Sequence, residues 1–169
     1  MEKILISACL FGQKVRYNGS DLMLAQTDLE TLGEIAELIP FCPEVAGGLT
    51  TPRPPAEIFP ANGEKVLDGS ATIKTTDGNN VTRAFISGAQ QALSLCQQHK
   101  IRYAILTESS PSCGSSLIYN GKFEGEKTEG QGVTTALLRQ SGIQVFSQFT
   151  LEALIEQLKT ETDTPTLPV

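Results

Sequence analysis

The sequence predicts a single α/β domain with a mostly parallel sheet and helices on both faces, a Rossmann-like arrangement. Short apolar runs rich in β-branched residues alternate with stretches whose apolar residues recur every three or four positions. The chain has 169 residues, which suits one domain with a hydrophobic core. No internal repeat divides it. We therefore predict one domain over residues 1–160, followed by a flexible tail over 161–169.

The first third of the chain predicts two strands, one helix and a long loop. Residues 3–9, "KILISAC", form a short apolar run typical of a strand. Apolar residues at helical spacing predict a helix over 27–38, and "LIPFC" at 38–42 predicts a second strand. Residues 43–60 contain five prolines and a Gly-Gly pair. A segment this long and stiff favours a functional loop over a passive connection.

The rest of the chain continues the alternation of strands and helices. Glycine-containing turn signals and changes of apolar period mark the boundaries between elements. The predicted elements are a small hairpin or ribbon around 70–76, a helix over 81–99, a third strand over 101–107, a turn-rich excursion over 117–132, a helix over 133–142, a fourth strand over 143–148 and a last helix over 150–159.

Charge and hydropathy exclude several classes of function. The formal net charge is −6, and the 13 Lys and Arg residues are scattered rather than clustered. Phosphate backbones would repel such a chain, which argues against bulk nucleic-acid binding. No apolar run approaches the roughly 18 residues of a membrane span. The first residues, "MEKILISACLFG", are not followed by the small-residue cleavage site of a signal peptide. We expect a cytoplasmic protein, and the sequence does not indicate its oligomeric state.

Three of the four cysteines lie at the ends of predicted strands. Cys9 ends the first strand, Cys42 ends the second, and Cys113 lies in "SSPSCGSS", the loop that leaves the third. Parallel strands bring their carboxyl ends to one edge of a sheet, where ligands bind. A shared site for these three residues and simple burial of each are both open. Cys96 lies on the apolar stripe of a helix, where packing is the better interpretation.

Three converging thiolates would suit a soft metal centre. One possibility is an iron–sulfur cluster on three cysteines, which leaves one iron free for another ligand. The other is zinc held by three cysteines and water. A thiol enzyme with Cys113 as nucleophile is weaker, because His99 is the only histidine that could serve as its base.

The segments "SACLFGQKVRYNG", "FCPEVAGGLTTPRPPAEI" and "SSPSCGSS", in this order, resemble the thiouracil desulfidase family. With "GVTTALLRQSGIQVFS", the resemblance spans about residues 3–158. It implies a [4Fe–4S] cluster on Cys9, Cys42 and Cys113, with one open iron for the sulfur of 2-thiouracil, 4-thiouracil or 4-thiouridine. The implied reaction is a non-redox hydrolysis that replaces C=S by C=O and releases sulfide. The alternative is a non-catalytic iron–sulfur protein that carries or senses sulfide.

The resemblance also implies roles for residues around the cysteines. Glu44, two positions after Cys42, corresponds to the carboxylate that transfers protons, and Ser110 to a serine that assists it. Apart from the resemblance, the chemistry of the loop residues adds Arg16, Arg53 and Ser112 as expected substrate contacts. For each arginine a salt bridge or simple solvation is the open alternative, and for Ser112 it is turn capping. Thr107 stands where many relatives carry a lysine, so the thiolated base that this chain accepts stays open.

Overall fold

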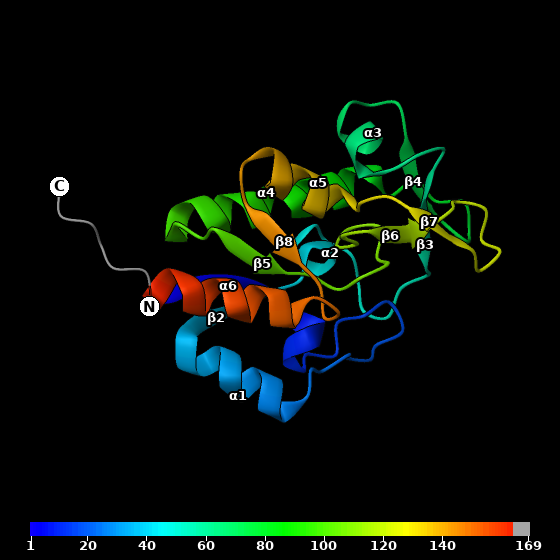
Figure 1. The fold of residues 1–169 in the computed structure, drawn as a ribbon. Coiled ribbons are helices and arrows are strands. Elements are labelled where there is room, and N and C mark those ends of the chain that lie inside the picture. Colours follow the sequence, from blue (N-terminus) through cyan, green and yellow to red (C-terminus); the bar gives the residue numbers. More distant parts are fainter. Residues whose placement is uncertain (164–169) are drawn as a thin grey trace.

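The computed structural model describes residues 1–163, which form a parallel sheet between helices (Figure 1). The four strands of the sheet lie in the order β2-β1-β5-β8, and each neighbouring pair is parallel. They are β1 (Glu2–Ser7), β2 (Ala36–Phe41), β5 (Tyr103–Ile105) and β8 (Gln144–Phe146). The α/β class and the parallel sheet predicted from the sequence are confirmed.

Helices cover both faces of the sheet because its strands are apolar on both sides. Alternate residues of β1 point to opposite faces. Ile4 packs with Leu32 of α1 (Gln26–Ile35) and Leu154 of α6 (Leu151–Asp163). On the other face, Leu5 packs with residues of α4 (Thr82–His99) and α5 (Val133–Gln140). The continuous apolar run of β1 therefore reflects burial from two sides, as expected for a parallel sheet.

Two boundaries in the first third of the chain differ from the prediction. β1 ends at Ser7, and the next residues form a short 3-10 helix, η1 (Ala8–Phe11). Helix α1 ends at Ile35, and β2 begins at Ala36 because it pairs in register with the start of β1. The apolar residues here fit both periods, and the tertiary pairing decides between them.

The predicted functional loop contains regular structure. It holds a short helix, α2 (Pro43–Ala46), and a strand, β3 (Ala56–Phe59), that pairs antiparallel with β4 (Thr72–Thr75). The partner strand of the ribbon expected around β4 is therefore part of the loop. Along the chain, α3 (Gly63–Leu67) connects the two strands.

The turn-rich excursion is a second ribbon, made of β6 (Leu117–Tyr119) and β7 (Lys127–Glu129). It lies beside the β3–β4 ribbon (Figure 1).

The end of the chain departs from the predicted domain limit. Helix α6 continues to Asp163, so residues 161–163 extend the last helix rather than begin a tail. The remainder of the predicted tail lies outside the described residues. Within residues 1–163, no helix combines the length and apolarity needed to cross a membrane.

Candidate active site

A pocket of about 590 Å³ opens at the carboxyl ends of the sheet strands. Its lining includes Ser7 at the end of β1, Phe41 at the end of β2 and Thr107 beyond β5, together with residues of both ribbons. The chain leaves β1 toward β2 on one side and later returns to β5 on the other, so the strand order reverses here. Ligands of open α/β sheets bind at such a point. The volume lies within the roughly 300–1,000 Å³ of small-molecule sites.

Cys9, Cys42 and Cys113 all line this pocket, each from a different turn. Cys9 lies in η1, Cys42 is the N-cap residue of α2, and Cys113 lies in the loop after β5. The structure thus brings together the three cysteines that the sequence singled out. Cys96 does not join them, since it is buried between α4 and the sheet.

Burial raises the pKa of all three pocket thiols. For Cys113 the negative charges of Glu44, Cys42 and Cys9 add to the effect of burial on the pKa. The pKa of Cys9 is raised by burial, against the opposing effects of a hydrogen bond with Thr107 and the positive charge of Arg16. Three thiolates so close together repel one another. They would need a compensating cation, which iron atoms would provide.

The spacing of the thiols bears on the kind of metal centre. Among residues 1–163, no three His, Cys, Asp or Glu side chains lie close enough together to hold one metal ion. The geometry therefore lends no support to zinc on three cysteines. In an iron–sulfur cluster each cysteine binds its own iron, so the sulfurs lie farther apart than around a single ion. Three thiols that line one pocket and affect the pKa of one another are compatible with such an arrangement.

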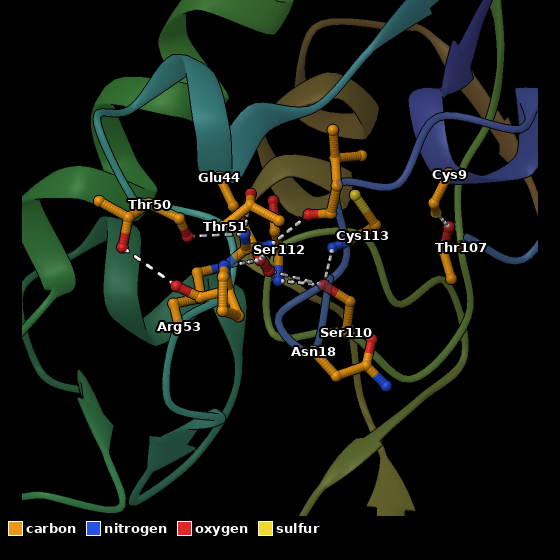
Figure 2. Close-up of polar contacts among 12 residues, drawn as sticks. Cys9, Asn18, Glu44, Thr50, Thr51, Arg53, Thr107, Ser110, Ser112 and Cys113 are labelled. Carbon is orange, nitrogen blue, oxygen red and sulfur yellow. Dashed lines mark hydrogen bonds and ion pairs between the residues drawn. The ribbon is translucent and has the colours of Figure 1, made fainter. Parts of the chain in front are cut away.

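Arg53 is bound to Glu44 and to oxygen atoms of nearby loop residues, among them Thr50 and Thr51 (Figure 2). Its Nε donates to Glu44 Oε2 at 3.0 Å, and Nη2 contacts the same oxygen. The other N–H groups donate to the carbonyls of Val15 (3.0 Å) and Thr50 (3.1 Å) and to the hydroxyl of Thr51 (3.1 Å). All five donors of this guanidinium are thus occupied. Arg53 has the salt-bridged role, and the structure leaves it no donor for the predicted substrate contact.

Ser110 connects the same carboxylate to the loop of Cys113. Its hydroxyl donates to Glu44 Oε1 at 3.3 Å and accepts the backbone N–H groups of Ser112 (3.0 Å) and Cys113 (3.2 Å). Because the two accepted bonds fix the oxygen, its proton points toward Glu44. The pair predicted to handle protons is therefore in contact.

Ser112 does not take its predicted place in the pocket. It is fully buried, its hydroxyl lies 2.7 Å from that of Thr134 in α5, and it is not among the lining residues. Backbone N–H groups at the start of α5 bind the carbonyls of Pro111 and Ser112. Ser112 thus anchors the Cys113 loop to α5, in line with the alternative of turn capping.

Arg16 is the arginine that remains available to a ligand. It lines the pocket and is half-buried. The one hydrogen bond of its side chain within the described part of the chain is a long one, 3.4 Å to Ser20, and its guanidinium lies 5.8 Å from the centre of the Tyr17 ring. The structure therefore separates the two predicted arginines.

His99 lies near the edge of the sheet opposite the pocket. It ends α4, and the chain then enters the amino end of β5, at the edge of the sheet opposite the pocket. It is not among the pocket residues. The geometry does not support a thiol nucleophile at Cys113 with His99 as its base.

The sequence reasoning missed Glu108, which organises the loop that carries Cys113. Its Oε1 accepts the N–H groups of Ser115 (2.8 Å), Ser116 (3.0 Å) and Leu117 (3.0 Å). Burial opposes its ionisation, but the Ser115 hydroxyl and these N–H groups outweigh burial and lower the pKa of Glu108 to about 2. An acidic residue beside a run of serines and glycine, whose N–H groups need acceptors, was the available signal.

Ser7 and Thr107 were also missed as contacts of the thiols. The Thr107 hydroxyl lies 2.8 Å from Cys9 Sγ, and the Thr107 N–H donates to Ser7 Oγ at 3.0 Å. The side chain of Ser7 in turn lowers the pKa of Cys113, although burial raises that pKa more. Small hydroxyl residues where two adjacent strands end are a weak signal for such contacts.

Comparisons with known proteins identify the family and similar chains. A family model described as 2-thiouracil desulfurase matches residues 4–149. The chain is 44% identical over 152 residues to the Uncharacterized protein YbbK of Bacillus subtilis (strain 168). The aligned residues make up 90% of this chain and 99% of YbbK. A solved structure of the [4Fe-4S]-dependent thiouracil desulfidase TudS shares 50% identity and a TM-score of 0.84, covering 95% of this chain and 99% of that one.

Proposed function

The chain belongs to the 2-thiouracil desulfurase family, and from this membership we propose that it hydrolyses the C=S bond of a thiolated pyrimidine such as 2-thiouracil, 4-thiouracil or 4-thiouridine. Water supplies the oxygen of the new C=O bond. The sulfur leaves as sulfide with the protons of that water, and no electrons are transferred overall. The observation that carries the proposal is the meeting of three thiols with the Glu44–Ser110 pair in one pocket.

We propose that Cys9, Cys42 and Cys113 hold a [4Fe–4S] cluster with one open iron. The similarity to a [4Fe-4S]-dependent relative and the shared pocket of these thiols support this ligand set. When bound, such a cluster supplies a soft Lewis acid that takes the thiocarbonyl sulfur and makes its carbon more electrophilic.

Glu44 is the proposed proton carrier. Arg53 occupies Oε2, whereas Oε1 faces the hydroxyl of Ser110. Oε1 is thus the oxygen that can accept a proton from the attacking water and return it to the leaving sulfide. Ser110 keeps this oxygen oriented, since its own position is fixed by backbone N–H groups.

Arg16 and the apolar walls are the proposed substrate contacts. Arg16 has free donors for a carbonyl oxygen of the pyrimidine ring. Val15, Leu22 and Phe41 line the same pocket and offer apolar surface to the faces of the ring. A small, mostly apolar base with a few polar edges fits this combination.

The test is a desulfuration assay under anaerobic conditions. The protein is reconstituted with iron and sulfide and mixed with 2-thiouracil, 4-thiouracil or 4-thiouridine. Loss of the thiocarbonyl absorbance and released sulfide are measured. We expect one sulfide for each oxygenated product from at least one of the three compounds. Glu44→Gln should keep its iron and lose at least about 100-fold in rate, the scale of a lost general acid–base.

Two outcomes would contradict the proposal. Turnover by cluster-free protein at the rate of the reconstituted protein would remove the role of the cluster. A reconstituted protein that binds sulfide but converts none of the three compounds would favour the sulfide carrier or sensor.

A further inference from the structure

Two buried hydroxyl residues lie at the ends of adjacent strands, and each acts on one of the pocket thiols. Figure 2 shows the contact between Thr107 and Cys9, in which Oγ1 lies 2.8 Å from Sγ and each residue is 8% exposed. Ser7 is 3% exposed, and its side chain lowers the pKa of the Cys113 thiol against the larger effect of burial. The two hydroxyl residues are themselves joined, because the Thr107 N–H donates to Ser7 Oγ at 3.0 Å.

The chemistry of a metal-bound cysteine fixes the direction of these bonds. Between a thiol and a hydroxyl, either group can donate. A thiolate that binds iron has no proton, so the proton in the bond must come from Thr107. The sulfur of Cys9 is also the one hydrogen-bond partner of the Thr107 hydroxyl among the described residues. Ser7 accepts the N–H of Thr107 and therefore keeps its own proton for the sulfur of Cys113.

We propose that Thr107 and Ser7 donate hydrogen bonds to the thiolates of Cys9 and Cys113 and thereby tune the cluster. This inference rests on the proposed function, because it takes these thiolates as cluster ligands. A donor withdraws charge from sulfur and stabilises the more negative, reduced state, so it makes the reduction potential more positive. It also offsets the repulsion among buried thiolates, which slows loss of iron.

The third thiol has a different set of donors. The hydrogen bonds that lower the pKa of Cys42 come from the backbone N–H groups of Val45 and Glu44 in α2, and burial remains the larger, opposing effect. The hydroxyl donors are thus specific to the two cysteines that follow β1 and β5. Ser7 and Thr107 contact neither substrate nor reacting atoms in this proposal. Both act through the cysteines, as positioning residues.

Thr107→Val tests the inference, since valine keeps the shape of threonine and removes only the donor. We expect a reduction potential more negative than that of the wild-type protein and several-fold faster release of iron to a chelator. Thr107→Ser keeps the hydroxyl and should stay close to the wild type in both measurements. Thr75→Val is the matched control, because Thr75 is a threonine of similar burial, 7% exposed, whose hydroxyl accepts the N–H of Asn79 instead of contacting sulfur.

Ser7→Ala tests the proposed hydrogen bond to Cys113 independently and should shift both quantities in the same direction. A potential and a rate of iron release that are unchanged in both Thr107→Val and Ser7→Ala, with full iron content, would overturn this inference and leave the proposed function intact. Failure of the wild-type protein to take up iron would overturn both.

Discussion

The Nε atom of Arg53 donates to Oε2 of Glu44 at 3.0 Å, and this leaves Oε1 facing Ser110 in the loop that carries Cys113. The side chains are only 7% and 14% exposed, respectively, so the ion pair is largely shielded from water. The same guanidinium binds the carbonyl of Val15, in the segment whose Tyr17 carbonyl accepts the backbone N–H of Arg53. One side chain therefore fixes the orientation of the carboxylate and joins two segments that line the pocket.

Arg53→Lys should impair turnover more than substrate binding. An ammonium is a point charge and cannot reproduce five donors in a planar fork. A carboxylate that is misplaced by about 1 Å can cost about 100-fold in rate, so we expect kcat to fall about 10–100-fold with a small change in KM. Arg16→Ala is the comparison, and it should mainly raise KM. If Arg53→Lys raised KM alone, Arg53 would be a substrate contact.

Alanine at any one of Cys9, Cys42 and Cys113 should abolish the visible absorbance of the reconstituted protein, because a cluster on three ligands loses one. Cys96→Ala is the control within the same chain. It should keep the full absorbance and cost about 1 kcal/mol of stability, since it removes one buried atom from the packing of α4. Iron content and absorbance are measured together. Full iron in any of the three variants would show that its cysteine is not a ligand.

Gly88→Ala should destabilise the protein although alanine is the better helix former. A Cβ at Gly88 would lie 1.9 Å from the carbonyl oxygen of Pro43, so α2 and α4 could not keep their close packing. We expect a loss of about 1–3 kcal/mol, as for other overpacked sites, with reduced activity because α2 carries Glu44.

Gly33→Ala in α1 is the matched control. A Cβ there meets nothing within 4 Å, so we expect a gain of up to about 1 kcal/mol. Urea unfolding of the two variants measures the contrast. Equal effects of the two substitutions would refute the packing argument.

Glu108 should make stability depend on acid pH. Its pKa is lowered from 4.5 to about 2 in the folded protein. A lowered pKa stabilises the fold above the unfolded value, and this contribution is lost as pH falls from about 4.5 toward 2. A shift of this size would give about 3 kcal/mol for a fully buried group, and solvent screening of this partly exposed carboxylate reduces it to about 1–2 kcal/mol.

Glu108→Gln measures that contribution in the cluster-free protein. At pH 7 the variant should be less stable than the wild type by about 1–2 kcal/mol, and the difference should narrow as pH falls toward 2. The guanidinium of Arg139 also acts on this carboxylate and keeps its charge throughout the range. A difference that stays constant with pH would show that Glu108 acts through packing alone.

Part of the candidate site could be predicted because it follows from where strands end. The three cysteines lie in the segments that follow β1, β2 and β5, so a parallel sheet was enough to place them at one edge, and the family resemblance then implied a shared site. The contact between Glu44 and Ser110 was implied by family resemblance, not by spacing, since 66 positions separate them. Ser112 was misplaced because its neighbour Ser110 has the same chemistry, and only the path of the loop decides which hydroxyl faces the pocket.

The amino-acid sequence by itself determined the alternation of strands and helices and the edge where the thiols gather. Apolar periodicity and turn residues within segments of about ten positions are enough to predict these properties. Only the tertiary structure decided that Arg53 is hydrogen-bonded to Glu44 and that the Thr107 hydroxyl contacts the Cys9 sulfur. The second contact depends on the register in which Ile6 of β1 faces Ile105 of β5, which brings together residues 98 positions apart. Packing of the whole domain sets that register, and no local pattern records it.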